Sequence, residues 1–217
     1  MKVLLHTSYY GNNGLADGLN TLAQLYKGLL ENKWPEKLIG QKPSLITQEG
    51  KIIAIKRNSG RISEIWRAMD HPLKQLVQFE TLDNTLIQKI IKEEDVQLVE
   101  IPNHLFNCEP LSLAIWEPKE SWVMQTSAWE KHNLDSAEVT QEFIRNKTII
   151  YLRDNLPIKE SIKIIQQAKG YIGTDGNMLH LALTILPPHA IHLFAPEDKL
   201  SPNGKRARGF GVNLHSC

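Results

Sequence analysis

One stretch indicates the fold most clearly: residues 171–182 read Tyr-Ile-Gly-Thr-Asp-Gly-Asn-Met-Leu-His-Leu-Ala. Its first residues are typical of a buried strand that ends at Ile172, and a helical apolar pattern begins at Met178. Between them, Gly173 and Gly176 bracket a Thr-Asp pair, which is a turn signal. Such a turn directs backbone N–H groups and the positive end of a helix dipole at one spot. The stretch therefore predicts a strand, a turn and a helix that together suit a phosphate.

The composition is that of a folded protein with a substantial core. The chain has 217 residues, of which 41% are hydrophobic and 23% charged, enough for one large domain or two small ones. The net charge of +1 gives no global signal for nucleic-acid binding. Cys108 and Cys217 fit no metal-binding spacing and are expected to be free thiols. No stretch resembles a signal peptide or a membrane span, so a cytoplasmic location is expected, with peripheral contact at the inner membrane face left open.

The first half of the chain has the order expected at the start of a doubly wound α/β domain. Apolar residues at Val3–Leu5 predict a buried strand, and residues 11–14 predict a turn after it. Leucines at helical spacing then predict a helix that begins at Leu15 and ends before Pro35. Ligands of such sheets bind beyond the carboxyl ends of the strands, where residues 12–17 are expected. The remaining elements predicted here are a hairpin or extended edge at 44–56, a helix at 62–77 interrupted near Pro72, a helix at 84–94 and a strand at 97–101.

A looser segment flanked by Pro110 and Pro118 separates the two halves. Residues 1–118 and 119–217 are therefore predicted to form two Rossmann-like lobes with parallel sheets and a cleft between them. The strands predicted in the second half are 122–124, 148–152, 171–172 and 190–194, and the helices are 137–145, 157–167 and 178–185. The tail from Lys199 is rich in glycine and basic residues, and it is interpreted either as a solvated tail or as a phosphate clamp.

Two stretches resemble the heptosyltransferase family of lipopolysaccharide synthesis, which is of the glycosyltransferase family 9 type and has the GT-B fold. Residues 172–182, followed by His192–Asp198, resemble the family's Asp-x-Gly-x-x-His-Leu-Ala turn and its Phe/Tyr-Gly-Pro loop. Residues 14–22 resemble the N-terminal Gly-Asp loop that leads into a Leu-x-Thr-Leu helix. This chain departs from the pattern in that Gly176 follows Asp175 directly, and it is shorter than a typical member.

The resemblance implies an inverting, metal-independent transfer of a sugar from a nucleoside diphosphate donor to a glycan or glycolipid acceptor. The N-terminal lobe would present the acceptor, and the C-terminal lobe would hold the nucleotide sugar. Asp17 is the implied catalytic base, by its place after the first strand and by the resemblance. No metal or cofactor is expected, because backbone N–H groups and cationic side chains can meet the charge of the leaving diphosphate. The residues expected to bind the donor are Thr174, Asp175, Gly176, Asn177, Met178, His180, Lys131, Lys199 and Lys205.

Several of these residues also have a structural interpretation. Asp17 can complement the dipole of its helix, and Asp175 can brace its own turn through an Asx-type hydrogen bond. His180 can be a buried core histidine. The alternative function is a non-catalytic nucleotide-sugar-binding module, or a pseudo-enzyme subunit that completes its site in an oligomer. The small size and the compressed segment between Met124 and Thr148 favour this alternative.

Overall fold

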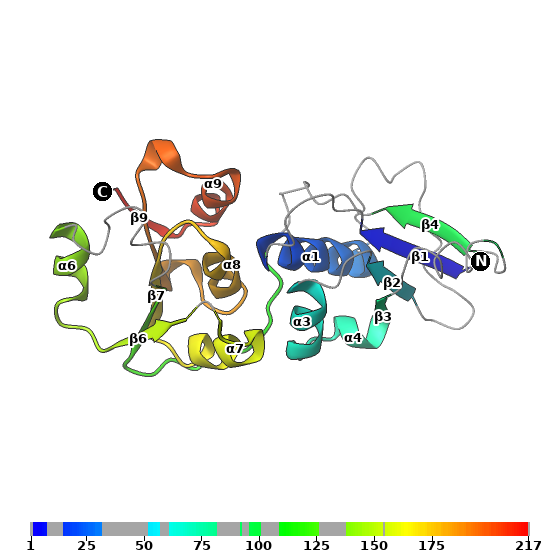
Figure 1. Ribbon diagram of the computed structural model, residues 1–217, viewed down its shortest axis with the longest axis horizontal. Helices are drawn as coiled ribbons and strands as arrows, with labels where there is room; N and C mark the ends of the chain where they lie inside the picture. Colours follow the sequence, from blue (N-terminus) through cyan, green and yellow to red (C-terminus); the bar gives the residue numbers. More distant parts are fainter. Residues whose placement is uncertain are drawn as a thin grey trace. The chain divides into compact units, whose positions relative to one another are not determined.

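The computed structural model describes residues 2–7, 15–31, 52–56, 61–81, 92, 96–100, 109–125, 138–153 and 155–216 (Figure 1). By its internal contacts the chain divides into Met1–Leu111, called unit 1 below, and Ser112–Cys217, called unit 2. Each unit holds one sheet, and every strand pair in both sheets is parallel. The prediction of an α/β protein with parallel sheets, compatible with a Rossmann-like fold, is therefore confirmed.

The sheet of unit 1 has four strands in the order β3-β2-β1-β4. They are β1 (Lys2–Thr7), β2 (Ile52–Lys56), β3 (Val77–Thr81) and β4 (Val96–Glu100). β1 lies between β2 and β4, so the order of the strands reverses beside it. Open parallel sheets bind ligands at the carboxyl ends of the strands at such a reversal. The chain enters α1 (Leu15–Glu31) from that end of β1.

The helices of unit 1 bury the apolar face that the sequence predicts. In α1, the side chains of Leu15, Leu19 and Leu22 lie at helical spacing and are buried. α3 (Arg61–Ala68) packs against α1 and buries Ile65 completely. The short α4 (Leu73–Leu76) then leads directly into β3. The helix predicted from Leu15 is thus confirmed.

One prediction for unit 1 is wrong. β2 lies inside the sheet, parallel to β1 on one side and to β3 on the other, so residues 52–56 form neither a hairpin nor an edge. The helix predicted at 62–77 with an interruption near Pro72 is confirmed: α3 ends at Ala68, and α4 follows Pro72 and ends at Leu76. β3 begins at Val77, and the sequence analysis did not predict this strand, whose residues Val-Gln-Phe-Glu-Thr alternate apolar and polar side chains and pair with β2. The helix predicted at 84–94 falls almost entirely outside the described residues.

Unit 2 contains a five-stranded sheet in the order β6-β5-β7-β8-β9. Its strands are β5 (Trp122–Gln125), β6 (Ile149–Leu152), β7 (Gly170–Gly173), β8 (Ile191–Phe194) and β9 (Asn213–His215). The four strands predicted in this half are all present. After β6 the chain returns to the other side of β5, so the direction of the strand order changes between β5 and β7. That place is the topological switch point of this sheet, where ligands of doubly wound proteins bind.

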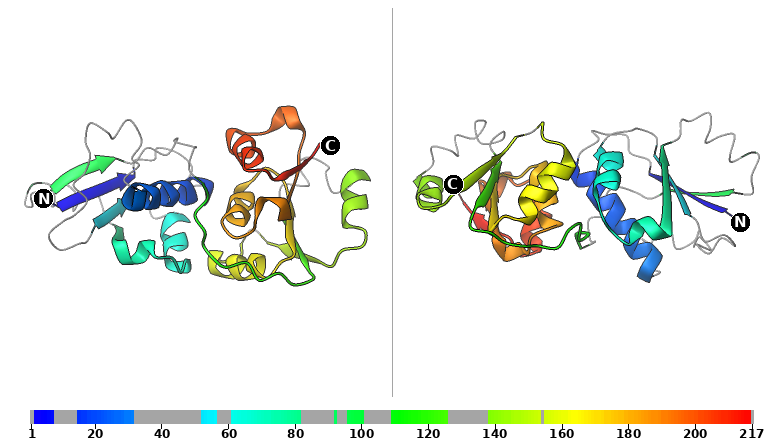
Figure 2. Two further views of the ribbon diagram at one scale, coloured as in Figure 1. Left: turned by 180° about the vertical axis from the view of Figure 1, so that it is seen from behind. Right: turned by 90° about the horizontal axis from the view of Figure 1, so that it is seen from below.

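Helices cover both faces of this sheet. α7 (Ile158–Gln166), α8 (Asn177–Leu183) and α9 (Pro202–Gly209) lie on one side, and α6 (Glu138–Ile144) lies on the other (Figure 2). Two single turns, η2 (Pro188–Ala190) and η3 (Glu197–Lys199), lead into β8 and α9. In the described part of the chain, no helix has the length and apolar character needed to cross a membrane. The core between the helices and the sheet is formed by apolar side chains that include Ile162, Ile165, Leu179, Ala182, Ile191 and Leu193.

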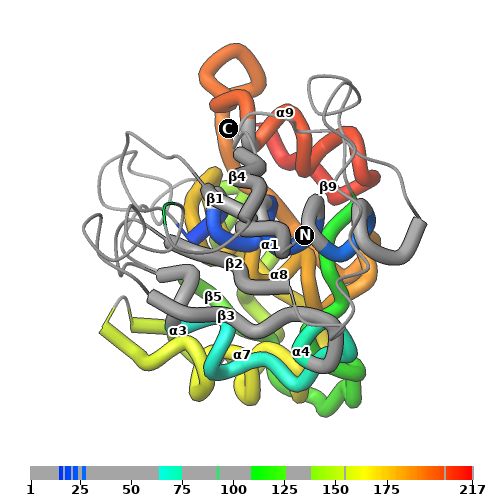
Figure 3. Tube along the Cα trace, turned by 90° about the vertical axis from the view of Figure 1, so that its right-hand side faces the viewer, coloured from blue at the N-terminus to red at the C-terminus, as the bar shows by residue number. Residues whose placement is uncertain are grey.

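The tail from Lys199 is folded into α9 and β9, and the side chains of Lys199, Lys205 and Arg208 are exposed. Ser201 caps α9 with a side chain that accepts a hydrogen bond from the backbone N–H of Gly204 at 3.1 Å. Pro202 occupies the first turn, where its missing N–H costs nothing. β9 then pairs with β8, and this last part of the chain can be followed from orange to red in Figure 3. A segment so rich in glycine has a low helix propensity, and its tertiary contacts decide the outcome.

Candidate functional site

The turn between β7 and α8 lies at the switch point of the unit 2 sheet. β7 ends at Gly173, and the neighbouring strand β5 ends at Gln125. α8 begins at Asn177, and Gly176 precedes it in an extended conformation without a side-chain cap. The N–H groups at this helix start are therefore not capped by the side chain of the N-cap residue. The predicted phosphate turn thus lies where a parallel sheet is expected to bind its ligand.

Two neutral polar side chains, those of Tyr171 and Gln125, lie beside this turn. The hydroxyl of Tyr171 donates a hydrogen bond to Oε1 of Gln125 at 3.0 Å, and both residues are buried. A Cβ atom on Gly173 would lie 2.4 Å from the Tyr171 hydroxyl, so only glycine leaves room for this ring. A Cβ atom on Gly176 would lie 3.8 Å from Gln125 Oε1, which places the Gln125 amide beside the turn. The hydrogen-bonded pair therefore forms one wall of the candidate site.

Thr174 supplies a buried hydroxyl without a hydrogen-bond partner in the described part of the chain. Its side chain is 2% exposed, and its Oγ1 has no hydrogen-bond partner among the described residues. A buried polar atom without a partner costs about 1–3 kcal/mol and requires an explanation. Thr184, buried in the same helical layer, shows the usual arrangement, because its hydroxyl donates to the carbonyl of Leu181 at 2.7 Å. The Thr174 hydroxyl can therefore still form a hydrogen bond to a ligand.

Asp175 joins the turn to α9. Its Oδ2 atom accepts a hydrogen bond from the backbone N–H of Ser201 at 2.7 Å, 26 residues further along the chain. The carboxylate also lies against the backbone of Gly204, where an added Cβ would be 2.3 Å from Oδ2. The Asx-type interpretation is thus replaced by a brace between two segments that are distant in the sequence.

His180 is neutral at physiological pH. It lies in α8 and is 6% exposed. Burial, and to a smaller extent the positive charge of Arg206, lowers the pKa of its imidazole to about 4, while the negative charge of Asp175 acts in the opposite direction. Arg206 is half-buried in α9, with its guanidinium carbon 5.2 Å from the ring centroid of Phe210. His180 therefore senses both the carboxylate of Asp175 and the guanidinium of Arg206.

The other predicted site residues have more peripheral positions. Asn177 is exposed in the first turn of α8, and Met178 beside it is half-buried. Lys199 and Lys205 are exposed in η3 and α9. Asp17 belongs to the first turn of α1 in unit 1, and its side chain lies outside the described residues. Lys131 also lies outside them.

The sequence analysis did not single out Gln125 or Tyr171. Gln125 is a polar residue directly after the apolar run Trp122–Met124, and a polar residue at the carboxyl end of a buried strand is a signal that can identify such a site. No comparable signal marks Tyr171, because a tyrosine in a buried strand is ordinary core material. Its role follows from the contact with Gln125.

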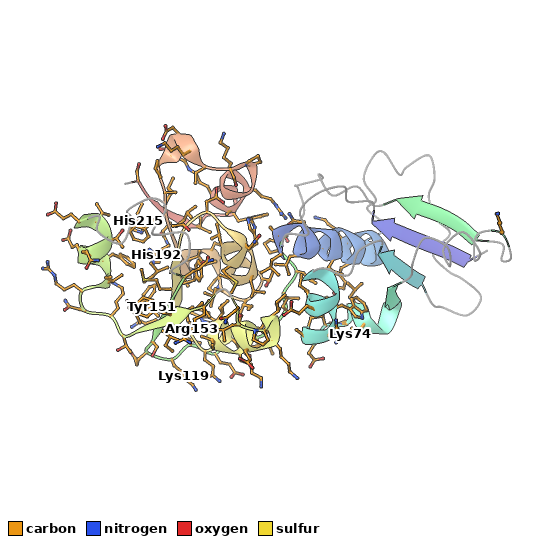
Figure 4. The ribbon with its side chains drawn as sticks, viewed as in Figure 1. Lys74, Lys119, Tyr151, Arg153, His192 and His215 are labelled. Carbon is orange, nitrogen blue, oxygen red and sulfur yellow. The ribbon has the colours of Figure 1, made fainter. Side chains whose placement is uncertain are left out.

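A second polar cluster lies on the opposite face of the sheet, under α6. Nδ1 of His192 and Nε2 of His215 are 2.9 Å apart, and Figure 4 shows the two rings close together. His215 stacks on Phe194 with ring centroids 4.4 Å apart, and Phe143 of α6 covers His192 at the same distance. Burial lowers the pKa of His192 to about 4, with smaller contributions from His215 and from Lys147. One neutral imidazole therefore donates to the other within an aromatic environment.

Comparison with models of known protein families and with curated proteins found no match for this chain. Among the side chains that the structure describes, no group of three or more His, Cys, Asp or Glu residues is placed to hold a metal ion. The functional argument therefore depends on the geometry of the β7–α8 turn.

Proposed function

We propose that this protein is a glycosyltransferase with a nucleoside diphosphate sugar as its donor, and that unit 2 binds the diphosphate at the β7–α8 turn. One observation carries the proposal: the buried hydroxyl of Thr174, without a partner among the described residues, lies at the switch point of a parallel sheet. The resemblance of residues 172–182 to heptosyltransferases supplies the donor class.

In this proposal each group beside the turn has a distinct role in binding. The Thr174 hydroxyl and the uncapped N–H groups after Gly176 donate hydrogen bonds to phosphate oxygens. His180 remains a neutral donor, because its pKa lies near 4. Arg206 supplies positive charge beside it. These groups stabilise the negative charge that develops as the nucleoside diphosphate leaves.

The chemical step follows the same hypothesis. The acceptor hydroxyl of a glycan or glycolipid attacks the anomeric carbon, the bond to the diphosphate oxygen breaks, and the configuration inverts. Asp17 takes the hydroxyl proton. A carboxylate near a helix N-terminus is a weak base, but it suffices when the proton moves late in the reaction.

The first experiment measures thermal unfolding with ADP, UDP, GDP, CDP and their sugar conjugates, with inorganic phosphate and the free nucleosides as controls. A ligand present at 100 times its dissociation constant is expected to stabilise the protein by about 2.7 kcal/mol. Thr174→Val is expected to reduce the stabilisation by the diphosphate. A flat response to every nucleotide contradicts the proposal.

The second experiment separates an enzyme from a binding module. Donor hydrolysis and sugar transfer are measured for the wild type, Asp17→Asn and Asp17→Ala. Loss of turnover with unchanged stabilisation by the diphosphate supports catalysis with Asp17 as the base. Binding without turnover in the wild type supports the non-catalytic module instead, and unchanged turnover in Asp17→Ala removes this residue from its role.

A further inference from the structure

The carboxylate of Asp175 closes the N-terminus of α9. It accepts the N–H of Ser201 at 2.7 Å, one residue before the helix begins. It also lies flat against Gly204, since a Cβ there would be 2.3 Å from Oδ2, 2.6 Å from Cγ and 2.9 Å from Oδ1. No side chain larger than hydrogen fits at Gly204 while the carboxylate keeps this position.

The sequence of α9 explains why an external carboxylate is needed. Residues 202–209 include two glycines and three basic residues, and the first turn contains no acidic residue. An eight-residue helix of this composition is marginal by itself. A negative charge at the N-terminus complements the helix dipole, and within its own segment α9 has only the neutral hydroxyl of Ser201 for this purpose.

We propose that Asp175 is a positioning residue, which holds α9 against the β7–α8 turn and thereby keeps Arg206 beside His180, without contacting the ligand itself. Three observations support this. The carboxylate accepts a hydrogen bond from Ser201 and lies close to the backbone of Gly204. α8 and α9 pack against each other. The charges of Asp175 and Arg206 both act on His180, in opposite directions.

The consequence for ligand binding rests on the proposed function. A carboxylate at the start of a phosphate turn repels a diphosphate unless its charge is offset. The N-terminus of α9 provides that offset, and α9 also carries Arg206, whose positive charge acts on His180. In this arrangement Asp175 holds α9, and with it the positively charged Arg206, in place.

The first test needs no ligand and uses the close contact with Gly204. Gly204→Ala is expected to lower the Tm of the wild type, because its Cβ displaces the carboxylate. In the Asp175→Ala background the obstructing atoms are gone, so the same substitution is expected to leave Tm unchanged or to raise it. Gly209→Ala is the matched control in the same helix, since a Cβ there meets nothing within 4 Å. An equal change in Tm on Gly204→Ala in the two backgrounds contradicts the contact between Asp175 and Gly204 and overturns the proposal.

The second test uses the pKa of His180, followed by NMR and assigned with a His180→Gln variant. If Asp175 holds α9 in place, Asp175→Ala releases α9, and the pKa of His180 rises from about 4 toward 6.5 as water enters and Arg206 moves away. Asp175→Asn keeps an oxygen that can accept a hydrogen bond from Ser201, so α9 is expected to stay in place. The pKa of His180 is then expected to fall below its wild-type value, because only the negative charge is lost. A lower pKa of His180 in both variants overturns the proposal, because Asp175 then acts only through its charge.

The third test measures the dissociation constant for the diphosphate that stabilises the wild type best. Asp175→Ala is expected to weaken binding of the diphosphate at least tenfold, because release of α9 removes Arg206 and a hydrogen bond to a charged group is worth roughly tenfold or more. Asp175→Asn keeps α9 in place and is expected to weaken binding by no more than about threefold. Equal losses in both variants show that the carboxylate charge itself is needed by the ligand and overturn the positioning role. If no diphosphate binds to the wild type, the proposed function fails, whereas the Tm and pKa results still decide whether Asp175 holds α9.

Discussion

The hydroxyl of Tyr171 donates to Oε1 of Gln125 at 3.0 Å, across the two strands between which the strand order of unit 2 changes direction. Tyr171 belongs to β7 and Gln125 is the last residue of β5. The bond crosslinks the carboxyl ends of the strands at the switch point. It therefore fixes the position of the wall against which the β7–α8 turn is built.

Tyr171→Phe removes this bond without changing the volume of the ring. We expect a loss of about 1–2 kcal/mol in the free energy of unfolding, measured by urea denaturation, because a buried hydrogen bond is lost. Tyr151→Phe is the control, because Tyr151 is 54% exposed and its substitution is expected to stay within about 0.5 kcal/mol. Equal effects of the two substitutions contradict the structural role of the Tyr171–Gln125 pair.

Thr174→Val and Thr184→Val test whether an unsatisfied hydroxyl behaves differently from a satisfied one. Both residues are buried, at 2% and 3% exposure. Thr174→Val removes a hydroxyl without a partner in the described structure and is expected to stabilise the ligand-free protein by about 1 kcal/mol. Thr184→Val breaks the bond to the Leu181 carbonyl and is expected to destabilise it by about 1 kcal/mol. Destabilisation by Thr174→Val shows that its hydroxyl is satisfied in solution and removes the observation that carries the proposed function.

The stability of the fold is expected to fall in acid because of its buried histidines. The pKa values of His180, His192 and His215 are lowered in the folded state, so the unfolded chain binds more protons than the folded one below pH 6.5. Stability is thus fully present above pH 6.5 and is lost progressively as pH falls toward about 4. Urea unfolding between pH 7.5 and 4.5 measures this slope, and His192→Phe is expected to reduce it. A stability that does not change over this range contradicts the burial of these imidazoles.

Gly211 follows Phe210, the C-cap residue of α9, with a backbone φ of +92°, which residues with a Cβ rarely adopt. Gly211→Ala is expected to destabilise the protein by about 1 kcal/mol, whereas Gly211→Asn costs less because asparagine tolerates positive φ better. Thermal unfolding of the two variants provides the comparison, with Gly209→Ala, at the last residue of α9, as the control. Equal Tm values for Gly211→Ala and the wild type contradict the positive φ at this residue.

The sequence is sufficient for the local elements. The strand, turn and helix at 171–182 and the leucine face from Leu15 follow from hydrophobic period and turn residues, which are local properties of the chain. The place of Thr174 at the start of a turn follows in the same way. Periodicity does not report which distant segments meet, so β3, α9 and β9 do not follow from it.

Only the tertiary structure decides how the polar groups are used. The Gln125 amide meets the Tyr171 hydroxyl because β5 and β7 are neighbours in the sheet. Asp175 accepts the Ser201 N–H because α9 folds back onto α8, and that contact also makes a helix of a segment with weak helix propensity. The sequence by itself thus determines that a strand–turn–helix with a threonine and an acidic residue in its turn exists. Packing between distant segments determines that the Thr174 hydroxyl has no described partner, whereas the Asp175 carboxylate accepts a hydrogen bond from Ser201. Hydrogen bonds between residues so far apart in the sequence form only once the order of the strands is set.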